Sequence, residues 1–365
     1  MVQIIRPTLV IDKSICLRNI ERMAQKAKDL QLRFRPHFKT HQSAIIGNWF
    51  RQYGVKAITV SSVQMAGCFS REGWDDITIA FPLNILEINL INQLASTINL
   101  NVLVENSEAS RILAQKISAP VGVFLKIDTG SKRTGIDASN TGLIDALLKL
   151  LGENEKIIFR GFLTHNGQTY SARSPNEIFS CHFDSLLKLQ KLKQKYRQKF
   201  PNIEVSIGDT PSCILCTNFV DVDEIRPGNF VFFDLMQQSL GVCDFRDIAV
   251  KMVCPVVSLH ASRNEIVIYG GAIHLSQETL INIDGKKFYG RIVVTKNGKK
   301  KLLSERNYVS RLSQEHGILK VSQKNFGLFD VGDLVEIIPV HACLTANLAR
   351  KYITTEGEEI TMINT

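Results

Sequence analysis

The chain has 365 residues, of which 44% are hydrophobic and 22% are charged, as in ordinary globular proteins. This length exceeds one small core and predicts two domains, and no segment approaches the ~20 consecutive apolar residues that cross a bilayer. The net charge is +9, and part of the surplus lies in a basic run from residue 188 to residue 199. We interpret that run as the solvated face of an outer helix rather than as a nucleic-acid-binding patch.

The opening segment, residues 1–7, lacks the basic start and apolar core of a signal peptide. We therefore expect a cytoplasmic protein without a membrane partner. The eight cysteines form no regular framework, which in a chain of this length indicates free thiols rather than disulfides. Cys213 and Cys216 have the spacing of a redox or zinc pair, but no second pair accompanies them.

Apolar runs alternate with amphipathic stretches from residue 30 to residue 235. Eight of the runs are predicted strands: Leu32–Phe38, Lys56–Ser61, Ile77–Phe81, Leu100–Val104, Val121–Ile127, Ile157–Thr164, Ile203–Ile207 and Glu224–Phe233. The predicted helices between them are Gln42–Tyr53, Asn84–Leu94, Ser107–Ile117, Thr141–Leu151 and Phe179–Phe200.

The strands carry the continuous Val, Ile and Leu runs of buried parallel strands. Eight strands that alternate with helices predict a (β/α)₈ barrel of the TIM type, which has ~250 residues. An open doubly wound sheet is the alternative. It is disfavoured in its dinucleotide-binding form because no Gly-x-Gly-x-x-Gly turn opens the chain.

After about residue 245 the pattern changes to short strands joined by turns. The predicted strands are Val250–His260, Glu265–Tyr269, Arg291–Thr295, Ile318–Ser322 and Asp333–Pro339. This part is expected to be a mostly antiparallel β domain, and the opening segment Ile4–Val10 is expected to belong with it.

Polar, glycine-rich sequences follow the predicted barrel strands. They are Lys39 after the first strand, 128–135 after the fifth, 164–170 after the sixth, 208–212 after the seventh and 226–229 within the eighth. The active residues of such barrels lie at the carboxyl ends of the strands. We therefore expect these sequences, including Asn229, to meet at one end of the barrel.

Lys39 is the candidate catalytic amine. A lysine that forms a Schiff base must lose its proton readily, and partial burial and nearby cations lower the pKa of an amine. Arg35, His37 and His41 could supply that environment. A surface lysine in a strand–helix loop is the alternative, which would be preferred for an isolated lysine.

Gly208, Thr210 and Ser212 lead from a strand into a short helical stretch. Backbone amides, two hydroxyls and a helix N-terminus are typical of an anion cradle and would suit a cofactor phosphate. A capped helix start with an early proline is an equally good interpretation.

Arg133, His165 and Tyr170 are candidates for a pyridine ring: the imidazole could stack on it, the guanidinium could bond it, and the phenol could bond cofactor or substrate. For each of them a structural role is the alternative, namely a salt bridge with Asp128, a core histidine and a packed loop tyrosine.

His341 and Cys343 follow an apolar strand, Leu334–Val340. Residues i and i+2 of a strand project to the same side, so the imidazole and the thiolate could hold one ion, for which zinc is suited. An inward cysteine beside a rim histidine is the alternative. The nearby sequence 314–317 is expected to form a polar loop whose His316 supplies an acid or base, or else a turn with a salt bridge.

Together these motifs resemble the D-serine dehydratase and D-threonine aldolase group, within the alanine racemase-like (fold type III) enzymes that use pyridoxal phosphate (PLP). The resemblance spans nearly the whole chain and includes 35–41, 128–135, 165–170, 208–212, 226–229, 313–317 and 338–343. It implies a PLP-binding barrel over 11–240 with PLP on Lys39. It also implies a β domain over 241–365, with 1–10, that carries a divalent metal, zinc, on His341 and Cys343.

The resemblance further implies a small-molecule amino-acid substrate and a homodimer. The expected activity is elimination from a β-hydroxy-D-amino acid such as D-serine. Aldol cleavage to glycine and an aldehyde, racemisation, and a PLP carrier without turnover are the alternatives. The chain departs from the group around the expected substrate site, at Tyr269-Gly270-Gly271, Leu344 and Gln168.

Overall fold

The computed structural model describes residues 3–296 and 299–363, which divide into two compact units. The first, here called the barrel unit, comprises Ile20–Gly228 and the chain end from Ile363. The second, the β unit, comprises the segment up to Asn19 and Asn229–Met362. The predicted domain limits, 11–240 and 241–365 with 1–10, remain a prediction, because compact packing does not by itself define a domain. Their outermost residues, 1–2 and 364–365, lie outside the described part of the chain.

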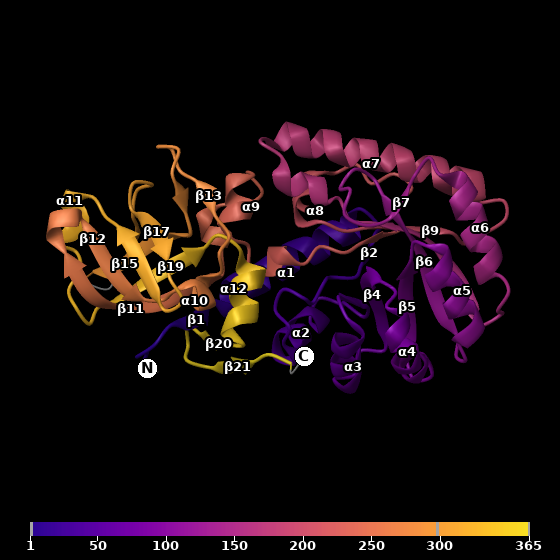
Figure 1. Cartoon of the computed structure of the whole chain (residues 1–365), viewed down its shortest axis with the longest axis horizontal. Helices are drawn as coiled ribbons and strands as arrows, with labels where there is room; N and C mark the ends of the chain where they lie inside the picture. Colours follow the sequence, from indigo (N-terminus) through magenta and orange to yellow (C-terminus); the bar gives the residue numbers. More distant parts are fainter. Residues whose placement is uncertain (1–2, 297–298, 364–365) are drawn as a thin grey trace. The chain divides into compact units, whose positions relative to one another are not determined.

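Eight parallel strands form the sheet of the barrel unit (Figure 1). They follow one another in the order β2, β10, β9, β8, β6, β5, β4 and β3. Their bounds are β2 Arg33–Phe34, β3 Ile58–Val60, β4 Asp76–Pro82, β5 Asn99–Val104, β6 Val121–Asp128, β8 Ile157–Thr164, β9 Glu204–Ile207 and β10 Glu224–Ile225. A two-residue strand, β7 (Ile136–Asp137), pairs with β6 outside this order.

Backbone hydrogen bonds join the two ends of this sheet into a barrel. The N–H of Phe38, which follows β2, donates to Thr59 O of β3 at 2.9 Å, and Thr59 N–H donates to Pro36 O at 2.9 Å. His37 and Thr59 accordingly form a parallel bridge. The predicted (β/α)₈ barrel is confirmed.

Helices connect the strands, as predicted for this fold. Their bounds are α1 Lys13–Asp29, α2 Ala44–Arg51, α3 Val63–Arg71, α4 Ile88–Ala95, α5 Ser107–Lys116, α6 Thr141–Leu151, α7 Pro175–Tyr196 and α8 Thr210–Leu215. The sequence did not predict α1 or α3. Helix α3 has only nine residues, and Gly67 interrupts its apolar face. It is fixed at its start because Ser62 Oγ accepts a hydrogen bond from Met65 N–H at 3.1 Å.

The eighth predicted strand was too long. Instead of Glu224–Phe233, β10 contains only Glu224–Ile225, and a 3₁₀ turn follows at Asn229–Val231. Pro227 explains the early end, because proline has no N–H to donate to a neighbouring strand. Its carbonyl still accepts from His37 N–H at 2.9 Å.

The β unit contains a mostly antiparallel sheet in the order β12, β18, β17, β15, β19, β11, β1, β20 and β21. Because β12 also pairs with β11, the first six strands close into a ring. The bounds are β1 Thr8–Ile11, β11 Val250–His260, β12 Glu265–Tyr269, β15 Gly290–Lys296, β16 Lys299–Leu302, β17 Tyr308–Leu312, β18 His316–Lys320, β19 Leu334–Pro339, β20 Lys351–Thr354 and β21 Glu359–Thr361. As predicted, the opening strand belongs here: β1 pairs with β11 and β20.

Short helices interrupt the β unit, where the sequence had predicted none of helical length. They are α9 Leu235–Ser239, α10 Ala272–Leu275, α11 Gln323–Phe326 and α12 Ala342–Ala349, and two further short strands, β13 Leu280–Ile281 and β14 Lys287–Phe288, pair with each other. Over residues 3–296 and 299–363, no helix combines the length and the apolar character of a bilayer span.

Gly161 tests how closely the barrel strands must approach. It lies in β8 at φ +144°, and a Cβ there would lie 1.9 Å from Glu204 O of β9. We expect Gly161→Ala to lower the free energy of unfolding by ~3 kcal/mol or more, because the backbone of β8 or β9 would have to shift to make room for the methyl group. Gly54→Ala is the control: its φ of +78° is also left-handed, but a Cβ there meets nothing within 4 Å, so we expect a loss of ~1 kcal/mol. Urea unfolding of both variants measures the difference, and equal losses would contradict the steric explanation.

Candidate active site

The carboxyl ends of the barrel strands bring together most of the predicted cofactor residues. Lys39 follows β2, Arg133 follows β6, His165 follows β8 and Gly208 follows β9. Since all eight strands are parallel, these positions lie at the same end of the barrel, here called the mouth. The charges of Lys39 and Arg133 both act on His165, which places the three side chains in one electrostatic environment.

His165 and Tyr170 are both tied to the loop that follows β9. His165 Nδ1 contacts Gly208 O, and Thr210 N–H donates to Tyr170 Oη at 3.2 Å. The two rings lie 5.9 Å apart at an interplanar angle of 31°. Burial, followed by the charge of Lys39, holds the pKa of His165 well below its usual range, so its imidazole is neutral near pH 7.

The segment from Gly208 to Ser212 contains two buried hydroxyl groups that could bind a ligand. Thr210 Oγ1 and Ser212 Oγ are buried and have no hydrogen-bond partner among the described residues. The first amides of α8 do not all remain available, because Asp209 Oδ2 accepts from Ser212 N–H at 2.7 Å. Gly208 lets the chain approach Arg226 closely, since a Cβ there would lie 3.0 Å from Arg226 Cβ. These two hydroxyls are therefore the groups that an anion would engage.

Lys39 lies in the turn after β2, and its side chain is exposed rather than partly buried as predicted. Its backbone N–H donates to His37 Nδ1 at 3.3 Å. Two of the three residues expected to surround it have other partners: Arg35 is bonded to Glu224 at 2.6 Å, and His41 is buried 4.4 Å from the ring of Phe38. Burial lowers the pKa of His41 to about 3, so it carries no charge near pH 7.

The charges of two further residues, Lys126 and Arg226, act on His165 together with that of Lys39. Arg226 belongs to the predicted motif 226–229, whereas Lys126 was not among the predicted site residues. Lys126 of β6 is buried, and burial together with the charges of Arg226 and Arg133 lowers its pKa to about 7. Arg226, directly after β10, is also buried and acts on His165 as well. Lys126 had one signal in the sequence: it is the single charged residue inside the apolar run Val121–Ile127.

The predicted metal pair lies in the β unit, but not on a strand. His341 is the N-cap of α12 and Cys343 lies in its first turn. The prediction from strand geometry was therefore wrong, because β19 ends at Pro339 and the chain turns into a helix. His341 Nδ1 accepts from Cys343 N–H at 3.2 Å, so the two side chains are brought together by a helix cap.

Asn229 and Asp234 support this pair. Asn229 Nδ2 donates to Asp234 Oδ2 at 2.7 Å and lies 3.7 Å from Cys343 Sγ. Asp234 Oδ2 also accepts from Ala342 N–H at 2.8 Å and lies 4.0 Å from His341 Nδ1. Asn229, predicted to bind the cofactor from a barrel strand, thus belongs to the β unit and contacts the predicted metal ligand.

The side chains around His341 supply only some of the ligands that a metal ion needs. Burial lowers the pKa of His341, but its hydrogen bond with Cys343 and the charges of Cys343 and Asp234 raise it to about 9. Within the described ranges, no group of three or more His, Cys, Asp or Glu side chains is placed to hold an ion. A metal held here would need further ligands from water or substrate, as catalytic zinc sites have.

His316 begins β18 and is exposed, so it is not in a loop as predicted. The turn before it packs on Gly271, where a Cβ would lie 2.3 Å from both Ser313 O and Gln314 O. Ala272 N–H donates to Ser313 O at 2.8 Å. Gly271 therefore lets α10 dock on the turn that leads into His316, whereas a Cβ at Gly270 would meet Cys254 Sγ at 2.4 Å.

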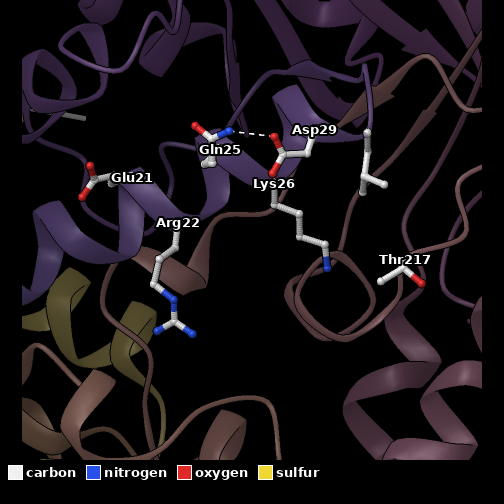
Figure 2. Close-up of a pocket in the computed structure, with 7 residues that line it drawn as sticks. Glu21, Arg22, Gln25, Lys26, Asp29 and Thr217 are labelled. Atoms are coloured by element: carbon white, nitrogen blue, oxygen red, sulfur yellow. Dashed lines mark hydrogen bonds between the residues drawn. The ribbon is translucent and has the colours of Figure 1, made fainter.

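A separate pocket of about 650 Å³ lies on the barrel unit between α1 and Thr217 (Figure 2). Glu21, Arg22, Gln25, Lys26 and Asp29 line it from α1, and Gln25 Nε2 donates to Asp29 Oδ1 at 2.7 Å. Lys26 Nζ is bonded to Ile214 O. No predicted site residue lines this pocket, and we assign it no role.

Two family models match the chain. The alanine racemase N-terminal domain matches residues 11–235, and a putative serine dehydratase domain matches residues 249–355. The first match covers more than half of the chain and most of the barrel unit, and the second covers most of the β unit.

Named relatives span nearly the whole chain. A D-serine dehydratase from Dictyostelium discoideum is 28% identical over 370 residues, covering 95% of this chain and 92% of the relative. A 3-hydroxy-D-aspartate aldolase from Paracoccus denitrificans is 24% identical over 369 residues, covering 95% and 87%. The structure of D-threo-3-hydroxyaspartate dehydratase from Delftia sp. has a TM-score of 0.88 and 26% identity, covering 98% and 97%. A cysteine-to-alanine mutant of that dehydratase has been solved in a metal-free form. The resemblance predicted from the motifs is confirmed.

Asp209 gives this site a pH-dependent stability. Burial raises the pKa of its carboxyl to about 6, above the ~3.9 of an unfolded chain. The folded state therefore binds the proton more tightly, and this contribution to stability is complete below pH ~4 and lost as pH rises through 6. Asp209→Asn keeps an acceptor for Ser212 N–H but cannot lose a proton. We therefore expect its free energy of unfolding, measured relative to that of the parent at the same pH, to rise by on the order of 2–3 kcal/mol from pH 4 to pH 7.5.

Urea unfolding of the two proteins across this pH range measures the gain. Asp137→Asn is the control, because Asp137 is an exposed carboxylate whose pKa is lowered by Ser139 rather than raised by burial. A stability difference between Asp209→Asn and the parent that stays constant with pH would contradict the prediction.

Proposed function

The chain belongs to the alanine racemase-like family, and we propose that it is a PLP-dependent lyase that acts on a β-hydroxy-D-amino acid. Elimination to a keto acid and ammonia, as expected of a D-serine dehydratase, is the leading form of the reaction. The relatives named as dehydratases support this form, and the relative named as an aldolase supports carbon–carbon cleavage as the alternative.

The observation that carries the proposal is the pair of buried hydroxyls, Thr210 Oγ1 and Ser212 Oγ, that have no partner among the described residues. Buried donors without acceptors cost free energy unless a ligand completes them. They lie at the mouth, after β9, on the same end of the barrel as Lys39. A phosphate bound there would accept from both hydroxyls, and the cations Lys126, Arg133 and Arg226 favour an anion at the mouth.

In this proposal Lys39 Nζ would hold the cofactor aldehyde, and the same amine, once the substrate amino group has released it, would take the α-proton. PLP supplies an electron sink for the bond that breaks. His165, neutral and held by Gly208 O, presents its ring face beside Tyr170. Tyr170 is oriented by the N–H of Thr210, and Arg133 adds positive charge from its exposed loop.

His341 and Cys343 would hold a divalent metal, and zinc suits an imidazole with a thiolate. The metal would supply a Lewis acid for the substrate hydroxyl. Asp234 and Asn229 keep the two ligands in place through the contacts described above, a role that supporting carboxylates commonly have at metal sites. We also propose His316 as an acid or base. The homodimer and the cytoplasmic location remain predictions.

Replacing Lys39 tests the cofactor linkage. We expect Lys39→Ala to lose the visible absorption of bound PLP and to lower turnover of D-serine by ~10³-fold or more, because the base for the α-proton is gone. Lys56→Ala is the matched control: Lys56 is also exposed, but it precedes β3 and lies at the opposite end of the barrel. Borohydride reduction followed by peptide mass mapping locates the linkage, and an adduct on another lysine would contradict the assignment.

The metal assignment and the reaction type can be tested together. We expect protein purified without chelators to contain ~1 zinc per chain, and His341→Ala and Cys343→Ala to lose it. Formation of keto acid from D-serine should fall at least ~100-fold in both variants. Cys181→Ala is the control, since Cys181 is a free thiol of similar exposure.

Elemental analysis measures the metal, and product analysis scores keto acid, glycine, aldehyde and enantiomer over a panel of D- and L-hydroxy amino acids. Glycine with an aldehyde as the main products would replace the dehydratase form by the aldolase form. Full zinc content in both variants would contradict the metal assignment.

A further inference from the structure

A line of alternating charges runs inside the barrel. Asp76 of β4 bonds the guanidinium of Arg35, with Nη2 at 3.2 Å from Oδ2. The Nε of Arg35 donates to Glu224 Oε2 of β10 at 2.6 Å. Arg35 and Glu224 are both buried, so water does not solvate their charges and each is stabilised by the other.

Ser206 of β9 joins this line to Arg226 at the mouth. Its hydroxyl donates to Glu224 Oε1 at 2.7 Å and accepts from Arg226 Nε–H at 2.7 Å. Ser206 is fully buried. It is the one uncharged side chain in a chain of contacts that begins at Asp76 and ends at Arg226.

Over the described residues, the other hydrogen bonds of Arg226 are to backbone. Its Nη2 donates to Thr164 O and, at 3.4 Å, to Ser206 O. Its guanidinium lies against Gly208, where a Cβ would lie 3.1 Å from Nη1. The charge of Arg226 acts on His37, His165 and Lys126 at the mouth. Ser206 is thus the only side chain seen to hold Arg226 Nε in the described part of the chain.

We propose that Ser206 is a positioning residue that fixes the Arg226 guanidinium at the barrel mouth by relaying the Glu224–Arg35–Asp76 charge line through its hydroxyl. The relay needs a group that donates and accepts at the same time, and a hydroxyl does both. Alanine does neither. Threonine can do both, and valine has the shape of threonine without the hydroxyl.

The catalytic consequence of the relay rests on the proposed PLP-dependent function, but its geometry does not. The first measurement therefore uses the protein without PLP. Hydrogen exchange of arginine Nε–H groups is followed by NMR, and the Arg226 signal is identified as the one absent in Arg226→Lys. We expect Ser206→Ala to speed exchange of this signal about tenfold, as the loss of one charge-assisted hydrogen bond predicts.

Ser206→Thr and Ser206→Val form the decisive pair, because both add a methyl group and only threonine keeps the hydroxyl. We expect slow exchange in Ser206→Thr and fast exchange in Ser206→Val, with similar melting temperatures. If Ser206→Ala does not fold, the threonine and valine variants still test the relay. Equal exchange in the threonine and valine variants would overturn the relay.

The second measurement uses the PLP-loaded protein. We expect Ser206→Val to shift the visible absorption of the bound cofactor and to lower kcat about tenfold, the same factor as for the exchange, with KM nearly unchanged. Ser206→Thr should resemble the parent in both. If the parent binds no PLP, the proposed function fails while the exchange result still decides the relay. If PLP binds and exchange differs but absorption and kcat do not, the positioning role at the active site is overturned.

Discussion

Every group at the mouth of the barrel depends on the closure of its sheet between Pro36–Phe38 and Thr59. Two backbone hydrogen bonds of 2.9 Å make this closure, and Lys39 is the next residue after it. The strand that supplies Lys39, β2, is only two residues long, so its register is fixed by its neighbours rather than by its own length. Through this closure, Lys39 comes to the same end of the barrel as the loops after β6, β8 and β9, which lie far away in the sequence.

Charge is distributed unevenly inside the barrel, and this distribution matches the proposed chemistry. Asp76 and Glu224 are both paired with Arg35, and Arg33 Nη2 also lies 3.8 Å from Glu224 Oε2. The mouth in contrast has the basic residues Lys39, Lys126, Arg133 and Arg226. Burial, followed by the charges of these residues, lowers the pKa of His165 and keeps its imidazole neutral. A site that is rich in positive charge attracts a phosphorylated anionic ligand. The buried hydroxyls of Thr210 and Ser212 add direction to that attraction.

The sequence predicted the elements whose patterns are purely local. Helix α6 and strand β11 begin and end at the predicted residues, and Gly152 directly follows the end of α6. The motif order also placed Lys39, His165 and Gly208 after parallel strands, because the fold class determines where such ends meet. Helix α3 was not predicted, although α2, which is one residue shorter and also contains a glycine, was.

What the sequence failed to predict depends on tertiary contacts. His341 and Cys343 are brought together by the first turn of α12 rather than by a strand, and the apolar pattern of the preceding strand did not indicate this turn. Asn229 followed a proline that ended its strand, and it now contacts Cys343. Burial lowers the pKa values of both Lys126 and Arg226, and the charges of Arg226 and Arg133 lower that of Lys126 further. Only the closed barrel brings about this burial.

The pairing of β1 with β11 and β20 imposes an order on biosynthesis. Strand β1 leaves the ribosome before any barrel strand, whereas both of its partners follow the whole barrel. Its apolar residues Leu9 and Ile11, buried in the finished protein, are therefore unprotected by those partners throughout barrel translation. The buried environment of these two side chains is complete only after β11 and β20 have been synthesised, so the β unit completes its folding after the barrel strands have emerged.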